Sequence, residues 1–139
     1  MKVADLSGRE LDWHVAKALG FRMVDVPPDI DRENTGQVLA PPLLLESGYT
    51  FPNRGALGRY AFIPHYSTSW LHGGPLIERE RINLFFEFDE NHPQVWHAMS
   101  DEKPRIKAAT AAGETPLIAA MRAFVSSKFG DEVPDAKEQ

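Results

Sequence analysis

Residues 75–99 have the sequence PLIERERINLFFEFDENHPQVWHAM, in which the spacing of apolar residues changes from that of a helix to that of a strand. Pro75 suits the first position of a helix, because its missing N–H would be unpaired there anyway. We therefore expect a short helix over residues 75–81. A helix that leads directly into strands favours the α+β fold class.

The residues after this helix predict a β-hairpin. Along residues 83–89, Leu84, Phe86 and Phe88 share one face of a strand, while Phe85 and Glu87 share the other. Asn91-His92-Pro93 would end that strand, and residues 95–99 suit the return strand. Residues 101–113 are first charged and then small and polar, so we expect them to form a surface connection.

Each end of the chain predicts a longer helix. Ser7 and Glu10 have the spacing of a capping box, and the apolar residues that follow predict a helix over residues 8–19. Thr115 suits the position before a helix, and the apolar stripe after it predicts a helix over residues 116–129. We therefore expect three helices packed on a small antiparallel sheet.

The stretch 24–64 is rich in proline and glycine, which forbid long regular elements. Two apolar runs within it, 43–45 and 60–63, suit short strands. We interpret the stretch as a long, irregular, insertion-like segment within a single domain spanning residues 1–139. The acidic tail 131–139 is expected to be frayed.

Composition excludes several classes of protein. The chain has 139 residues, of which 42% are hydrophobic and 25% charged, as in an ordinary globular domain. Its net charge of −5 and scattered basic residues argue against nucleic-acid binding. The absence of cysteine excludes disulfides and cysteine zinc sites. We expect no membrane span and no export signal, and hence a cytoplasmic protein.

The stretch 65–82 is the best candidate for a binding site, because it places hydroxyls, histidines and a tryptophan on a loop before a helix. We expect Ser67, Ser69 and Trp70 to form one wall of a pocket or partner groove. An indole offers a broad flat contact and serines offer donors and acceptors, which suits a small anionic or aromatic ligand. Alternatively, Trp70 fills the core and the serines cap local turns.

Gly73 and Gly74 would let a ligand approach the backbone at the expected start of the helix, where N–H groups attract anions. Pro75 removes one of those N–H groups, so a tight turn that serves packing is the alternative. Arg122, on the flank of the last predicted helix, is the expected opposing charge for an anionic ligand. A surface salt bridge is its alternative role.

The sequence leaves open whether the protein is an enzyme. His65, His72 and Glu78 are the acid–base candidates for a reaction on a nucleotide-like or other polar metabolite. The histidine spacing matches no metal motif, so neither a metal site nor a cofactor is expected. A small-ligand-binding or interaction module is favoured over an enzyme, and a homo-oligomer is left open.

Three segments resemble the NinX-like family of small phage and prophage proteins. They are LSGRELDWHVAKALG at 6–20, STSWLHGGPLIERE at 67–80 and GETPLIAAMRAFVSSKFGDEV at 113–133, in the order found in the family. The family is of unknown function and transfers no catalytic residue. The resemblance implies a phage accessory protein that acts in the cytoplasm of a bacterial host. The proline-rich stretch is an elaboration of this chain.

Overall fold

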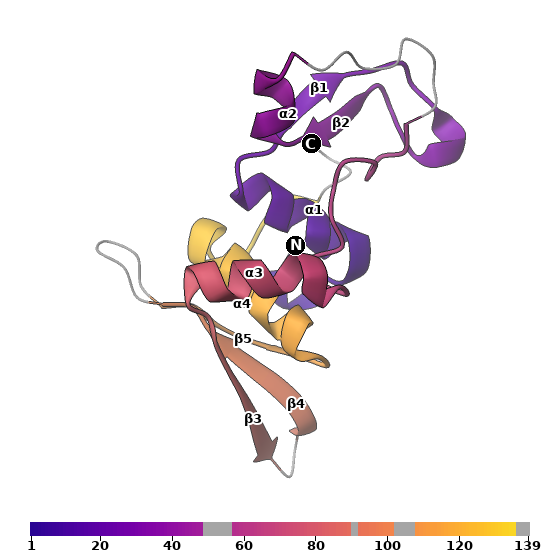
Figure 1. Cartoon of the computed structure of the whole chain (residues 1–139). Helices are drawn as coiled ribbons and strands as arrows, with labels where there is room; N and C mark the ends of the chain where they lie inside the picture. Colours follow the sequence, from indigo (N-terminus) through magenta and orange to yellow (C-terminus); the bar gives the residue numbers. More distant parts are fainter. Residues whose placement is uncertain (49–56, 90–91, 102–107, 136–139) are drawn as a thin grey trace. The chain divides into compact units, whose positions relative to one another are not determined.

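The computed structural model combines α-helices with two antiparallel sheets, which confirms the predicted α+β class (Figure 1). It describes residues 1–48, 57–89, 92–101 and 108–135. In chain order the described elements are the 3-10 helix η1 (Val3–Asp5), α1 (Gly8–Ala18), β1 (Arg22–Asp25), the 3-10 helix η2 (Ile30–Arg32), β2 (Gln37–Ala40), α2 (Pro42–Glu46), α3 (Trp70–Glu80), β3 (Asn83–Asp89), β4 (His92–Met99), β5 (Thr110–Gly113) and α4 (Pro116–Phe129).

These elements fall into two compact units. The first contains residues 1–15 and 65–139, and the second contains residues 16–64. Within the second unit β1 pairs with β2 in antiparallel register, with Arg22 opposite Ala40. The prediction of a single domain stays a prediction. No helix of the described residues is long and apolar enough to cross a membrane.

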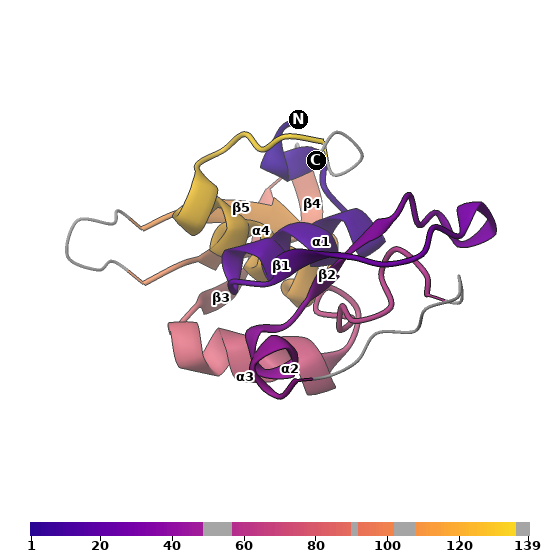
Figure 2. The same ribbon diagram turned by 90° about the horizontal axis from the view of Figure 1, so that it is seen from above.

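In the first unit, α4 packs on a three-stranded sheet of order β3-β4-β5 (Figure 2). The side chain of Ala98 on β4 is fully buried. Gly113 on β5 approaches α4 so closely that a Cβ atom there would lie 2.6 Å from the backbone nitrogen of Ala119. The sheet face that carries Ala98 and Gly113 therefore faces the core, and α4 covers it.

The two terminal helices are confirmed close to their predicted bounds. Leu6 and Leu11, which flank the start of α1, are fully buried, as expected when a helix start is fixed by apolar contacts. The capping box of Ser7 and Glu10 stays a prediction. The cap of α4 is formed, because the hydroxyl oxygen of Thr115 accepts the N–H of Ile118 at 3.1 Å.

The start of α3 was wrongly predicted. The helix begins at Trp70, and Pro75 lies inside it rather than at its first position. The amides of His72 and Gly73 donate to the carbonyl of Ser69 at 3.2 and 2.8 Å, which closes the first turn before the proline is reached. Proline has no N–H to donate inside a helix and is usually found in the first turn. The local sequence therefore does not favour a helix that begins five residues before Pro75.

Two further differences concern the strands of the first unit. β4 begins at His92, so the Asn91-His92-Pro93 break is shorter than predicted. β5, which pairs with β4, occupies residues 110–113 of the expected surface connection. The alanine and glycine residues of this short strand give no strand signal, and Gly113 is required by its close approach to α4.

The second unit corrects both strand assignments made for the proline-rich stretch. Residues 43–45 lie in helix α2, which begins at Pro42, whereas residues 60–62 lie in a turn and Ile63 has no regular structure. Instead, the buried amide of Asn34 organises this stretch. Its nitrogen donates to the carbonyls of Pro27 and Leu57, each at 3.1 Å. A buried amide with several backbone partners replaces long regular elements here.

The chain after α4 is held in place as far as Val133. The amide of Val3 donates to the carbonyl of Asp131, and the amide of Val133 donates to that of Met1, both at 2.9 Å. Val133 is buried. The expectation of a frayed tail from residue 131 is therefore wrong for residues 131–133, and residues 136–139 lie outside the described part.

The contrast between Gly73 and Gly74 generates a stability prediction. An alanine Cβ at position 73 would lie 2.7 Å from Cδ2 of Leu117 and closer still to the carbonyl oxygen of Tyr66. At position 74 its nearest neighbour would be the Trp70 ring at 3.7 Å, which is an ordinary contact. We expect Gly73→Ala to lower the free energy of unfolding by about 1–3 kcal/mol, as overpacking does.

The matched control is Gly74→Ala, which should raise the free energy of unfolding by roughly 0.5–1 kcal/mol because alanine is the better helix former. Urea denaturation followed by circular dichroism measures both variants. Equal effects of the two substitutions would show that the close approach at Gly73 does not limit packing.

Candidate functional site

A buried carboxylate anchors the loop that precedes α3. The backbone N–H of Ser67 donates to Oδ1 of Asp12 at 2.8 Å, and Arg9 donates to Oδ2 of the same carboxylate at 2.7 Å. Asp12 is fully buried on α1. The hydroxyl of Ser67 donates to the carbonyl of Gly8 at 3.3 Å. The loop is therefore tied to the first half of α1 by both polar groups of Ser67.

This anchoring changes the role expected of the two serines. Ser67 is 1% exposed and its N–H and hydroxyl are both committed to α1, so it fixes the loop. Ser69 has an extended backbone directly before α3, and its side chain caps no N–H of that helix. The carbonyl of His65 accepts the amides of Thr68 and Ser69 at 3.3 and 2.9 Å, which closes the turn between them.

Tyr66 is the buried aromatic residue of the same turn. The pKa of its phenol is raised to about 12, mainly by burial and also by the negative charge of Asp12, while the positive charge of Arg79 acts to lower it. The phenol is therefore neutral at ordinary pH. Since Tyr66 is only 8% exposed, it supports the loop from within and does not offer a proton to a ligand.

Trp70 is the exposed aromatic residue of the site. As the first residue of α3 it is 54% exposed, so the alternative in which Trp70 fills the core is wrong. Beside it lies a pocket of about 250 Å³. The pocket is lined by Ser67, Thr68, Trp70, Thr115, Pro116, Leu117 and Ile118.

The lining of this Trp70 pocket is uncharged. The polar side-chain groups of its lining residues are the hydroxyls of Ser67, Thr68 and Thr115 and the indole N–H of Trp70, and Thr68 is exposed. The oxygen of Thr115 already accepts the N–H of Ile118, but its hydroxyl hydrogen is left to donate. The pocket thus combines one aromatic surface, an apolar helix turn and a few hydroxyl groups.

Gly73 serves packing in this structure. It is buried, and its missing side chain lets α3 approach the Tyr66 carbonyl and Leu117 on α4. Its N–H donates within the helix to Ser69. Gly74 lies beneath the Trp70 ring. Gly73 therefore serves packing, as the alternative expects, but both glycines lie within α3 and not in a tight turn before it.

The structure does not bring Arg122 to this pocket. Nε of Arg122 donates to the carbonyl of Leu6 and Nη1 donates to the carbonyl of Ala112, both at 2.9 Å. These bonds join α4 to the N-terminal segment and to β5. Burial lowers the pKa of the guanidinium, while the negative charges of Glu114 and Asp5 raise it.

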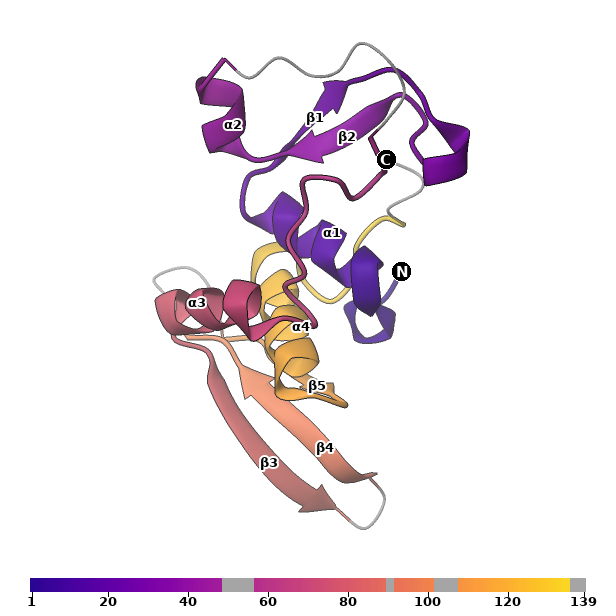
Figure 3. The ribbon, with the colours of Figure 1, turned by 45° about the vertical axis from the view of Figure 1, so that its right-hand side comes forward.

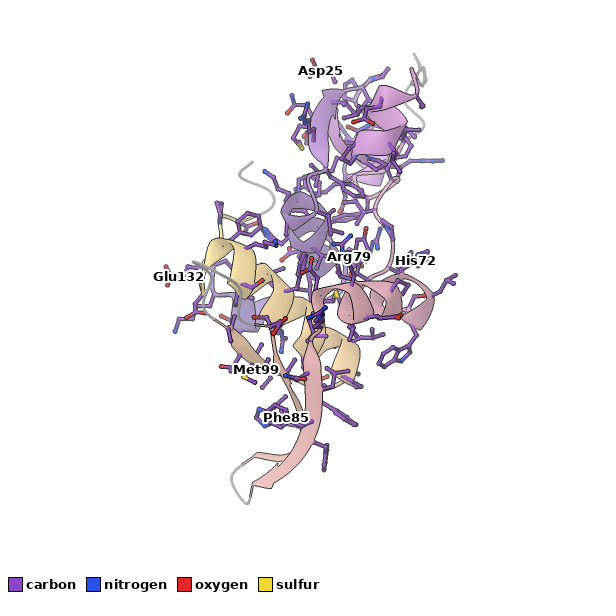
Figure 4. All side chains as sticks on the ribbon, turned by 60° about the vertical axis from the view of Figure 1, so that its left-hand side comes forward. Asp25, His72, Arg79, Phe85, Met99 and Glu132 are labelled. Atoms are coloured by element: carbon purple, nitrogen blue, oxygen red, sulfur yellow. The ribbon has the colours of Figure 1, made fainter. Side chains whose placement is uncertain are left out.

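Arg122 lines a different pocket, of about 410 Å³, on the side of β5 and η1. Lys2, Asp131 and Glu132 also line it, so charges of both signs surround the guanidinium. Figure 4 marks the position of Glu132 near the end of α4. Arg122 therefore does not lie opposite Trp70 as expected, because its guanidinium donates to two backbone carbonyls at another pocket.

The acid–base candidates do not converge. His65, His72 and Glu78 are all exposed. His72 and Glu78 lie on α3, where a spacing of six residues turns side chains about 120° apart around the axis. Figure 4 shows His72 and Arg79 near opposite ends of this helix. Among the described residues, no group of three or more His, Asp or Glu side chains could hold a metal ion.

Sequence reasoning misses Asp12 and Tyr66, which fix the loop. A carboxylate between Leu11 and Trp13, within an apolar stretch of helix, is the signal that could have identified Asp12, since buried carboxylates are rare unless paired. Its partner could not have been found in this way, because Ser67 lies 55 residues away along the chain.

The sequence of the chain was compared with those of known proteins. A family model described as bacteriophage P22, NinX matches residues 2–128. Curated protein sequences contain no match to the chain.

The buried phenol predicts a loss of stability in alkali. The pKa of Tyr66 is about 12 in the folded chain and 10.0 ordinarily, so below pH 10 both states are protonated and the stabilisation is complete. Between pH 10 and 12 the unfolded chain loses its proton first. At pH 11 we expect this residue to lower the free energy of unfolding by about 1.4 kcal/mol.

Tyr66→Phe removes this titration and is the control, because other tyrosines and lysines also titrate in the same range. Urea denaturation at pH 9 and pH 11 should show a smaller loss for the variant than for the parent chain. Parallel losses in the two proteins would contradict the burial of an ionisable phenol at this position.

Proposed function

The chain belongs to the bacteriophage P22 NinX family, and on that premise we propose that it is a phage accessory protein that binds a small aromatic ligand against Trp70. It would act in the cytoplasm of the infected bacterium. The observation that carries the proposal is a half-exposed tryptophan beside an uncharged pocket whose walls are fixed from within.

The exposure of Trp70 supports a stacking role. A tryptophan side chain can bury 150–250 Å². With 54% of the residue exposed, roughly 100 Å² is left in water, and covering it would contribute about 2.5 kcal/mol at 25 cal/mol per Å². The loop before Trp70 is already tied to α1 through Ser67, so a ligand would not have to order the loop in order to use this surface.

The pocket supports a ligand with one flat ring system. Its volume of about 250 Å³ is below the range of about 300–1,000 Å³ for drug-sized ligands. It exceeds the roughly 150 Å³ of an engineered cavity that binds benzene. An indole or a purine is of suitable size, and the hydroxyls of Thr68 and Thr115 could meet one or two heteroatoms of such a ring.

The uncharged lining favours an aromatic ligand over an anionic one. The expected cation, Arg122, donates to two carbonyls and lines another pocket. A phosphate group on the ligand would therefore gain no ion pair from the residues that line the Trp70 pocket. No observation favours the enzymatic alternative, since the acid–base candidates are exposed and dispersed.

The proposal predicts that uncharged aromatic compounds stabilise the protein. Indole and adenosine are suitable probes in a thermal-shift assay, and AMP tests the effect of a phosphate. We expect adenosine to raise the melting temperature at least as much as AMP does, with little dependence on salt. Binding that requires the phosphate and disappears at high salt would contradict the uncharged site.

Substitution of Trp70 then tests the location of the site. Losing about 2.5 kcal/mol of contact corresponds to a loss of affinity of up to roughly 70-fold, so Trp70→Ala should weaken binding at least about tenfold by calorimetric titration. Leu71→Ala is the matched control, since Leu71 is 78% exposed and does not line the pocket. Binding that survives Trp70→Ala in a folded protein, or no binding of any uncharged aromatic probe, would overturn the proposal.

A further inference from the structure

The pocket that Arg122 lines differs in character from the Trp70 pocket, and we call it the Arg122 pocket. Its volume of about 410 Å³ lies within the range of about 300–1,000 Å³ for small-molecule sites. It is lined by strand β5, the N-terminal segment, α4 and the residues that follow α4, and its described lining does not overlap that of the Trp70 pocket. Binding here would therefore be independent of the function proposed for Trp70.

Strand β5 presents backbone groups along its outer edge. It is the last strand in the order β3-β4-β5 and packs beside α4, so only one of its edges pairs with a described strand (Figure 3). The amide of Ser100 donates to the carbonyl of Ala109, and hydrogen-bonded and non-hydrogen-bonded pairs alternate along an antiparallel ladder. The N–H and C=O groups of Thr110 and Ala112 therefore point away from β4. Both residues line the Arg122 pocket.

The guanidinium of Arg122 is held at the same edge. Nη1 donates to the outward carbonyl of Ala112, and Nε donates to the carbonyl of Leu6, both at 2.9 Å. A guanidinium carries five N–H donors, so three are left beyond these two bonds. Both acceptors are neutral, so neither compensates the positive charge. Because the side chain is already ordered, it would bind a carboxylate at little cost in conformational entropy.

Opposite charges lie on another wall of the pocket. Lys2 and Glu132 are directly opposite one another in an antiparallel bridge, so their side chains lie on the same side of it. Backbone hydrogen bonds of 2.9 Å on either side of this pair hold the bridge. Asp131 also lines the pocket. The charged lining residues are thus two cations, Lys2 and Arg122, and two carboxylates, Asp131 and Glu132.

We propose that the Arg122 pocket binds a small zwitterion, an α-amino acid with an uncharged aliphatic side chain. The carboxylate of the ligand would accept hydrogen bonds from Arg122 and from the N–H of Ala112. Its ammonium group would lie against the carboxylates of Asp131 and Glu132. Its side chain would contact small apolar lining residues such as Ala4.

The balance of charge argues against other small ligands. A phosphate or a dicarboxylate would face Asp131 and Glu132 as well as the two cations. A simple amine would leave the charge of Arg122 uncompensated. The C-terminus of a peptide offers the same carboxylate, but it lacks an ammonium group on the adjacent carbon. A zwitterion is the ligand that matches both signs of charge at once.

Calorimetric titration of the full chain with L-alanine, L-valine and L-leucine tests the proposal. We expect at least one of them to bind at millimolar concentration. Its N-acetyl derivative lacks the ammonium group and its amide lacks the carboxylate, so each should bind at least about tenfold more weakly. In NMR spectra the amide signals of Thr110 and Ala112 should shift on binding, whereas that of Ile118 in the Trp70 pocket should not.

Two variants locate the binding groups. The double substitution Asp131→Asn and Glu132→Gln changes two exposed side chains and should weaken binding at least about tenfold. Glu46→Gln is the matched control, since Glu46 is exposed in the second unit, and it should leave the affinity unchanged. Arg122→Lys keeps the charge but loses the planar fork, so it should also weaken binding.

If Arg122→Lys does not fold by circular dichroism, the double variant decides, because its exposed positions tolerate the change. The proposal is refuted if none of the three amino acids binds, or if the N-acetyl derivative or the amide binds as tightly as the free amino acid. Full affinity in the folded double variant would refute it equally.

Discussion

The hydrogen bond from the Ser67 amide to the buried carboxylate of Asp12 is the constraint on which the arrangement of the site depends. A buried carboxylate without partners is very costly, and Asp12 accepts hydrogen bonds from Arg9 and from this loop amide. The loop is thereby tied to α1. From this anchor the chain turns through Ser69 into α3, which leaves Trp70 at the helix start with half of its surface exposed.

Close approach of two helices completes the same arrangement. Gly73 allows α3 to contact the Tyr66 carbonyl and Leu117, so the first turn of α4 forms the second wall of the Trp70 pocket. The helical Gly-Gly-Pro sequence costs stability locally, since glycine and proline are both poor in a helix interior. The close packing of α3 against the Tyr66 carbonyl and Leu117, which Gly73 allows, offsets this loss of helix stability. A site that departs from local preference is typical of a functional position.

Local signals predicted the parts of the fold that local forces determine. The helix starts at Gly8 and Pro116 and the strand over 83–89 follow from spacing and turn residues within a few positions. The start of α3 and strand β5 depend on contacts with α4, which no short window contains. For the site, an aromatic residue in the loop sequence identified Trp70. The bonds from Arg122 to Leu6 and from Ser67 to Asp12 span 116 and 55 residues of sequence and could not be predicted.

The most direct measurement is the hydrogen exchange rate of the Ser67 amide in the native chain, followed by NMR. Because this amide donates to a fully buried carboxylate, we expect protection close to that of the central amides of α1, although Ser67 lies in a loop. The neighbouring amide of Thr68, bonded at 3.3 Å in an exposed turn, should exchange much faster. Exchange of Ser67 at the rate of Thr68 would contradict the anchoring of the site by Asp12.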